Sequence, residues 1–242
     1  MRWRLTHKLA AMAAFAALLA SGFFAAGNGG RAEAKGAPPG VLFRPVLCVV
    51  PPYDRLVISH QPALSESSCG PFRLTPASTQ VVPSTQSASG FNYQSPQPAI
   101  ILEGERTTTA SHDSASRVVL LDGLPGSSVQ VGPPTSKGLR YLLGPAVMSS
   151  RSIVSAAATK TQTGAWVVDW TTTPAGSAQW DRVARASFHR LLAIDVGGVV
   201  VSAPIIEPTQ SVFTSFGGRG EVSGGWGRAE ATRIASAMQA GG

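Results

Sequence analysis

The segment from Leu191 to Ile206 constrains the fold more than any other part of the sequence. It consists of two short apolar runs with Gly197-Gly198 between them. Two adjacent glycines supply the positive φ values that both central residues of a type I′ turn require. Pro204 ends the second run or places it at a sheet edge, because proline has no N–H group for a β-ladder. The segment therefore predicts a β-hairpin, and an edge strand there would offer main-chain groups to an extended peptide.

Hydrophobic periodicity predicts further elements around this hairpin. Strands are expected at residues 41–50, 117–124, 139–144, 166–172 and 220–223. Helices are expected at residues 151–159, 174–188 and 228–239. From residue 139 onward the order is β-α-β-α-β-β-β-α. This order predicts an α+β fold, a mainly antiparallel sheet with helices packed on one face, preceded by a Pro/Ser/Thr-rich region.

The first residues have the composition of a targeting segment. Residues 1–8 are basic, residues 9–26 are uncharged and apolar, and Ala32-Glu33-Ala34 fits a small-x-small cleavage site. The apolar run also approaches the roughly 20 residues that span a bilayer. Residues 1–34 are therefore either a cleaved signal peptide or an N-terminal membrane anchor. Both alternatives place the rest of the chain outside the cytoplasm, secreted or anchored to the cytoplasmic membrane, because basic residues stay inside.

Two further regions follow the targeting segment. Residues 35–135 form an N-terminal region and linker, which is expected to be partly disordered because residues 71–114 are rich in Ser, Thr, Pro and Gln. Residues 136–242 form a folded domain. Cys48 and Cys69 are the two cysteines of the chain, and in an oxidising compartment such a pair predicts a disulfide.

The net charge of the chain is +7, of which residues 1–34 carry +3. The remaining excess is spread thinly and forms no run of Lys and Arg that would follow a phosphate backbone. Nucleic-acid binding is therefore not expected, and membrane contact is expected only through the N-terminal segment.

Short motifs in the last hundred residues resemble a known family. They are Tyr141–Pro145, Val200–Ile206, and Val222–Gly224 followed by Ala229–Ala231. In this order and spacing they resemble the P1 head of SecD, the subunit of SecDF whose large extracytoplasmic loop carries that head. The resemblance covers about residues 139–242. It implies a freestanding SecD-head-like domain without the C-terminal membrane helices.

The chain departs from the family pattern in three places. The hairpin tip is Gly197-Gly198-Val199 where SecD heads commonly have Asp-Gly-Lys, so the resemblance does not extend to the charges of that tip. Gly224-Gly225-Trp226 replaces the usual Gly-Asn-Phe, and Gly227 replaces the usual Ser/Thr helix cap. The fold is expected to tolerate all three changes.

The resemblance implies a non-enzymatic module that binds the Sec translocase, SecDF components or unfolded exported polypeptide. No cofactor or metal is expected. The expected interaction residues lie in the hairpin and in the turn before the last helix: Gly197, Gly198, Val199, Ser202, Ala203, Pro204, Ser223, Gly224 and Trp226.

Two other functions stay open from the sequence. One is a secreted or cell-envelope binding protein that reuses the head fold for an unrelated ligand. The other is a hydrolase with a site built from His112 or His189 and a serine. The adjacent residues of His112-Asp113-Ser114 cannot by themselves form a catalytic triad, which is assembled from distant segments.

Overall fold

The computed structural model describes residues 40–57, 63–74, 81–83, 91–93, 97–109, 112–124, 138–207 and 210–240. The expected signal or anchor segment lies outside these residues. So do residues 75–80, 84–90 and 94–96 of the Pro/Ser/Thr-rich stretch. None of the described helices is both long and apolar enough to cross a membrane.

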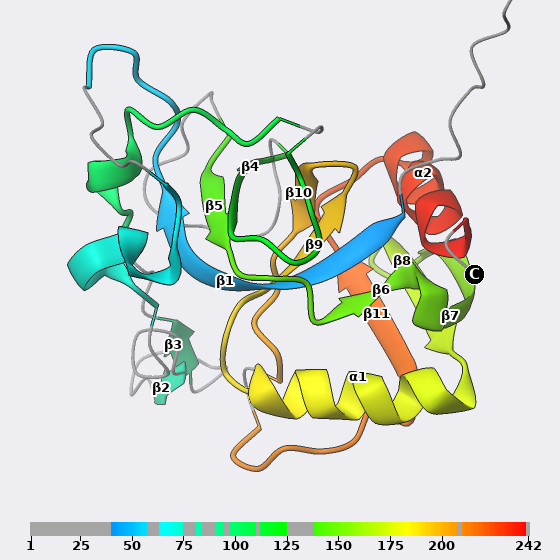
Figure 1. The fold of residues 1–242 in the computed structure, drawn as a ribbon. Helices are drawn as coiled ribbons and strands as arrows, with labels where there is room; N and C mark the ends of the chain where they lie inside the picture. Colours follow the sequence, from blue (N-terminus) through cyan, green and yellow to red (C-terminus); the bar gives the residue numbers. More distant parts are fainter. Residues whose placement is uncertain are drawn as a thin grey trace, which may run out of the picture. The chain divides into compact units, whose positions relative to one another are not determined.

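Five strands close into a barrel (Figure 1). They are β1 (Val41–Val50), β4 (Val119–Gly123), β5 (Arg140–Leu143), β9 (Leu192–Val196) and β10 (Val199–Ser202). The order of the strands around the barrel is β5-β4-β10-β9-β1, and β1 closes the barrel because it also pairs with β5. The long strand β1 can do this because residues 41–45 pair with β9 and residues 46–50 pair with β5. A short strand, β6 (Met148–Ser149), also pairs with β1.

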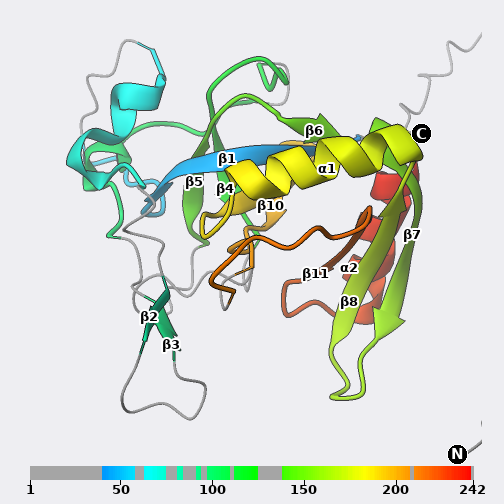
Figure 2. The same cartoon turned by 90° about the horizontal axis from the view of Figure 1, so that it is seen from below.

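A second sheet has three antiparallel strands in the order β11-β8-β7. They are β7 (Ile153–Lys160), β8 (Trp166–Thr172) and β11 (Arg219–Ser223). Figure 2 shows β7 and β8 as a long hairpin with helix α2 (Arg228–Gln239) lying along it. Helix α1 (Pro174–Ala186) follows β8, and Thr173 caps it by accepting a hydrogen bond from Gly176 N.

The remaining elements are short. They are the 3₁₀ segments η1 (Glu66–Phe72), η2 (Ile100–Leu102) and η3 (Ser150–Ser152), and the two-stranded hairpin of β2 (Val81–Pro83) and β3 (Phe91–Tyr93).

Three apolar clusters fill the structure. The first fills the barrel and takes alternate residues of its strands, such as Leu121 of β4 and Leu143 of β5. The second lies between the barrel and the three-stranded sheet and includes the buried faces of α1 and α2. The third covers the outside of the barrel, where η1 and η2 pack against the other faces of β4 and β5.

The disulfide prediction is confirmed. Cys48 of β1 is bonded to Cys69 of η1, with the two Cα atoms 5.9 Å apart. Both cysteines are fully buried in the outer cluster. The bond therefore fastens the η1 segment to the barrel.

The α+β class is confirmed, but a single sheet with helices on one face is wrong. The strands divide between a closed barrel and a separate three-stranded sheet. The boundary near residue 135 that the sequence indicated runs through the barrel, since β1 and β4 precede it and three other barrel strands follow it.

The helix expected at residues 151–159 is also wrong, because these residues form η3 and most of β7. A β-bulge shifts the register between Ile153 and Ser155. A bulge changes which side chains face the core, so Ile153 and Ala156 are both buried although they are three residues apart. This spacing imitates the buried face of a helix.

The predicted hairpin is confirmed as β9 and β10, with φ of 62° at Gly197 and 83° at Gly198. Of the two alternatives for Pro204, the one that places the second strand at a sheet edge is wrong. Strand β10 ends at Ser202 and lies between β9 and β4, because β4 pairs with it in parallel.

Candidate functional site

The two sequence motifs lie next to each other in the structure. Ser202 at the end of β10 donates a hydrogen bond from Oγ to the main-chain oxygen of Ser223 at the end of β11, at 2.9 Å. Val201 and Val222 belong to the same buried cluster. The hairpin of the barrel and the turn before α2 therefore form one continuous region.

The expected interaction residues differ in their exposure. Gly197 and Ser223 are exposed, and Gly198, Val199 and Pro204 are half-buried. The remaining four, Ser202, Ala203, Gly224 and Trp226, are buried. A partner can therefore reach the hairpin tip and its surroundings, whereas the buried members act only by shaping the fold.

Trp226 is buried because it lies against Gly224. A Cβ atom on Gly224 would come within 2.2 Å of the Trp226 indole ring. Trp226 is 9% exposed, and its indole N–H has no hydrogen-bond partner among the described residues. The glycine at position 224 therefore makes room for the indole ring of Trp226.

The hairpin tip is anchored by a buried carboxylate. Gly198 N donates to Asp195 Oδ1 at 2.9 Å, and Arg44 Nε donates to Asp195 Oδ2 at 3.1 Å. Arg44 and Asp195 are 0% and 1% exposed. The tip of the hairpin is thus tied to β1, which lies beside β9 in the barrel.

Arg44 also joins the loop that precedes β4. Its guanidinium donates to Asp113 Oδ1 at 2.8 Å and to the main-chain oxygens of Ser114, Arg117 and Gly144 at 3.0, 3.2 and 3.2 Å. With the bond to Asp195, all five donors of the guanidinium are used. Arg44 therefore holds together three segments that are distant in sequence.

Burial raises the pKa of Asp195 to about 6, and the negative charge of Asp113 contributes to the rise. The Gly198 amide and the Arg44 guanidinium oppose this shift because they favour the ionised carboxylate. Asp195 is therefore a buried acid that titrates in a mildly acidic range directly beneath the hairpin tip.

An apolar hollow of about 120 Å³ lies between the barrel and the three-stranded sheet. Its aromatic wall consists of Phe43, Trp170, Trp180 and Phe216, and its aliphatic wall includes Leu192, Ile194 and residues 204–206. Glu207 and Glu221 also line it. The indole N–H of Trp170 has no partner among the described residues, whereas Trp180 Nε1 donates to Arg219 O at 3.0 Å.

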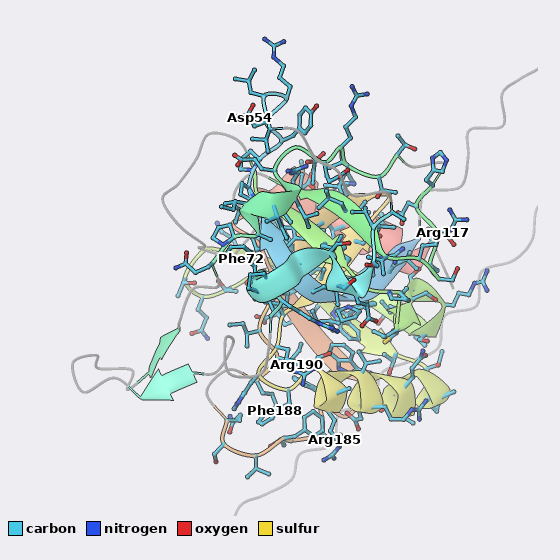
Figure 3. All side chains as sticks on the ribbon, turned by 60° about the vertical axis from the view of Figure 1, so that its left-hand side comes forward. Asp54, Phe72, Arg117, Arg185, Phe188 and Arg190 are labelled. Atoms are coloured by element: carbon cyan, nitrogen blue, oxygen red, sulfur yellow. A yellow bond between two sulfur atoms is a disulfide. The ribbon has the colours of Figure 1, made fainter. Side chains whose placement is uncertain are left out.

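The segment after α1 borders this region with further aromatic residues. Figure 3 shows Arg185 on the last turn of α1, with Phe188 and Arg190 just beyond the helix end. The Arg185 guanidinium lies 4.4 Å from the centre of the Phe213 ring, and Phe213 packs edge-on against Phe188. Asp181 of α1 accepts a hydrogen bond from Phe216 N at 3.1 Å, which fixes one wall of the hollow.

Sequence reasoning identified Pro204 and missed the other residues of the hollow. Phe43 precedes Phe216 by more than 170 residues in the chain. They come together only because β1 closes the barrel and the 210–218 segment crosses α1. The available signal was the concentration of aromatic residues on β8 and α1.

The histidines that a hydrolase would use are engaged in local contacts. His112 Nδ1 lies 2.8 Å from Thr109 Oγ1, while the neighbouring Asp113 carboxylate binds Arg44. His189 Nε2 lies 2.7 Å from Gln210 O, and its ring stacks on Phe188. Within the described ranges, no three His, Cys, Asp or Glu side chains are grouped so that they could hold a metal ion.

Three solved structures similar to this chain are all of SecDF. A crystal structure of SecDF in a super-membrane-facing form is 31% identical over 41% of this chain and 13% of its own, with a TM-score of 0.36. A structure of SecDF, described as a membrane component that enhances protein export, is 30% identical over 41% of this chain and 43% of its own, with a TM-score of 0.37. SecDF from Thermus thermophilus, described as translocon-associated, is 31% identical over 41% of this chain and 13% of its own, with a TM-score of 0.33.

The match thus spans well under half the length of two of these proteins and 43% of the other. No curated protein sequence matches the chain. The family model of the SecDF P1 head subdomain matches residues 128–242. This match confirms the resemblance derived from the sequence motifs and extends it to residues 128–242.

Proposed function

We propose that this protein is an extracytoplasmic, non-enzymatic interaction module that assists Sec-dependent protein export. It binds emerging unfolded polypeptide or the translocase itself. The observation that carries this proposal is the match of residues 128–242 to the SecDF P1 head subdomain. One of the similar structures is described as a membrane component that enhances protein export.

The apolar hollow supports binding of unfolded polypeptide. Its volume of about 120 Å³ suits one branched or aromatic side chain. Unfolded chains expose such side chains, and folded proteins bury them. Because Glu207 and Glu221 line the hollow, a segment with a basic residue beside the inserted side chain gains a favourable charge interaction.

The expected location agrees with this function. The Cys48–Cys69 disulfide is typical of an oxidising compartment. The basic and apolar composition of residues 1–34 directs the rest of the chain out of the cytoplasm, either as a released protein or on a membrane anchor.

The proposal is tested by binding of reduced, carboxymethylated lactalbumin, a permanently unfolded probe, with native lactalbumin as the folded control. Fluorescence anisotropy of the labelled probe should show saturable binding of the unfolded form alone. Ile205→Glu places a charge in the hollow, and we expect at least about tenfold weaker binding. Val212→Glu is the matched control, because Val212 is 73% exposed and does not line the hollow.

Equal binding of folded and unfolded probe, or no binding of either, counts against this function. So does an Ile205→Glu protein that folds normally and binds as well as the wild type.

A second candidate is a cell-envelope binding protein that uses the head fold for an unrelated ligand. It is favoured by one observation: β1 and β4 belong to the barrel but precede residue 128, where the family match begins. The barrel of this chain is therefore built in part from segments outside the matched region. Release of the mature protein into the medium, without contact to translocase subunits, would favour this candidate.

A further inference from the structure

Strand β7 lies at the margin of the three-stranded sheet, with β8 on one side and, among the described residues, no strand on the other (Figure 2). The opposite margin, β11, is occupied by side chains. Ser202 Oγ donates to Ser223 O, and Trp180 Nε1 donates to Arg219 O. The two edges of this sheet are therefore not equivalent.

The direction of the β7 main-chain groups follows from the hairpin that joins β7 to β8. Thr161 N donates to Ala165 O at 2.8 Å, so Thr161 faces β8. Main-chain groups alternate in an antiparallel pair, which directs those of Lys160, Ala158 and Ala156 outward. The contact of Gln239 agrees, since its Nε2 donates to Ala156 O at 2.8 Å from outside the sheet.

Gln239 of α2 therefore covers the carbonyl of Ala156, which lies near the middle of β7. The N–H and C=O groups of Ala158 and Lys160 continue beyond it toward the hairpin turn. β7 contains no proline, and its one charged residue is Lys160 at the last position. Such an edge is a ready template for pairing with another strand.

The charges at the two ends of β7 indicate which strand fits. Arg151 just before the strand and Lys160 at its end are exposed, and within the described part of the chain neither forms an ion pair. Asp169 lies on the neighbouring strand and accepts a hydrogen bond from Thr159. An incoming segment with acidic residues would therefore place them near unneutralised cations.

The same charges disfavour pairing of β7 with itself. An antiparallel pair of two β7 strands would place Lys160 of each copy near Arg151 of the other, and a parallel pair would align the two lysines. Like charges directly opposite in a sheet are destabilising. The parts of this chain outside the described residues contain one acidic residue, Glu33, so they are poor candidates as well.

The geometry points to the outer edge of β7 as a binding site for an extended acidic segment of another polypeptide, which adds a fourth strand to the β11-β8-β7 sheet. This inference rests on the proposed function, because it states how an unfolded chain would be held. Main-chain bonding to Ala158 and Lys160 supplies binding that does not depend on sequence, and Arg151 and Lys160 select for acidic side chains.

The probe that tests this inference is a fluorescein-labelled peptide of alternating valine and glutamate, as long as the 8 residues of β7. Two control peptides separate the contribution of the peptide's charge from that of its main-chain hydrogen bonds. One carries lysine in place of glutamate, and the other carries N-methyl groups on alternate amides, which removes main-chain bonding and keeps the charge. We expect saturable binding of the first peptide, with the amides of Ala158 and Lys160 protected from hydrogen exchange in the complex.

Two variants test the edge itself. The exposed residues Arg151 and Lys160 are changed together to glutamate, which should weaken binding of the acidic peptide about tenfold and improve binding of the lysine peptide. Arg106→Glu, another exposed arginine, is the matched control and should bind like the wild type. Gln239→Ala frees Ala156 O and should tighten binding severalfold.

The inference is overturned if the N-methylated peptide binds as tightly as the unmodified valine–glutamate peptide. It is also overturned if the charge-reversed variant binds the acidic peptide with the affinity of the wild type. Sedimentation of the free protein as a dimer with Ala158 and Lys160 already protected overturns it in favour of a second copy. Suppose that unfolded lactalbumin binds the wild type but not Ile205→Glu, and that the acidic peptide does not bind. The edge inference then fails and the proposed function stands. If the wild type binds neither probe, both fail.

Discussion

The hydroxyl group of Ser202 donates a hydrogen bond to the main-chain oxygen of Ser223 at 2.9 Å, and this bond links the barrel to the three-stranded sheet. Ser202→Ala removes the donor and should lower the free energy of unfolding by about 1 kcal/mol. Ser223→Ala is the control, because the acceptor belongs to the main chain and is retained. Urea unfolding followed by tryptophan fluorescence measures both. Equal destabilisation by the two changes would contradict this role.

The raised pKa of Asp195 predicts a pH dependence of stability. The folded protein holds the Asp195 proton up to about pH 6, whereas the ordinary pKa of an exposed aspartate is 3.8. Between these values the folded state binds more protons than the unfolded state, so stability falls as pH rises. The fall attributable to Asp195 is at most about 3 kcal/mol.

Asp195→Asn should remove this part of the pH dependence between pH 4 and 6 while Gly198 keeps an acceptor for its amide. Urea unfolding at a series of pH values compares the variant with wild type. Glu221→Gln, which changes an exposed carboxylate, is the control and should keep the wild-type slope. Parallel curves for wild type and Asp195→Asn would contradict the prediction.

Gly220 on β11 lies opposite Trp170 on β8, and the indole ring occupies the space of a side chain there. A Cβ atom on Gly220 would come within 2.1 Å of Trp170 Cζ2. Gly220→Ala should therefore destabilise the protein by about 2 kcal/mol or more, because the ring is buried and has little room to move.

The matched control for this change is Gly227→Ala. Gly227 has φ of −81°, and a Cβ atom there meets nothing within 4 Å. Its cost should be about 0.5 to 1 kcal/mol, because glycine is a better helix N-cap than alanine. Thermal unfolding measures both variants. Similar melting temperatures for the two would show that Trp170 adjusts to the added methyl group.

The Cys48–Cys69 disulfide joins residues that are 21 positions apart in the sequence. Closing a loop of that length should contribute about 3 kcal/mol to the free energy of unfolding. Chemical unfolding with and without a reducing agent should show this difference in the wild type. A Cys48→Ala, Cys69→Ala double variant should unfold like the reduced wild type and be insensitive to the reductant. If the reducing agent destabilised that variant as much as the wild type, the loss of stability could not be due to reduction of the disulfide.

Local sequence patterns predicted the parts of the fold whose partners are close in the chain. Gly197-Gly198 specified the β9–β10 hairpin because a two-residue turn is determined by its own φ values. The buried positions Trp180, Val183 and Ala184 likewise identified α1. The motifs at residues 200–206 and 222–224 indicated the resemblance to the SecDF P1 head, because each is a short stretch of contiguous residues.

Features that depend on contacts between residues far apart in the sequence could not be predicted from local patterns. The periodicity of Ile153 and Ala156 indicated a helix, and only the bulge against β8 explains it as strand β7. Arg44 gave no signal as the centre of a buried network, because Asp113 and Asp195 are far from it in sequence. The hollow joins β1 to the 210–218 segment, so its lining residues share no local motif.

The most direct test of an export role is crosslinking in living cells with a photoreactive residue at Val199, which is half-buried at the hairpin tip. Crosslinked proteins are identified by mass spectrometry, and a photoreactive residue at Val154, which is 63% exposed on β7, samples the sheet edge in parallel. The account predicts that translocase subunits or nascent exported chains are recovered from the wild-type protein. Recovery of neither, with the protein well expressed and correctly localised, would contradict it and would leave the likeness to the SecDF P1 head as one of sequence and fold.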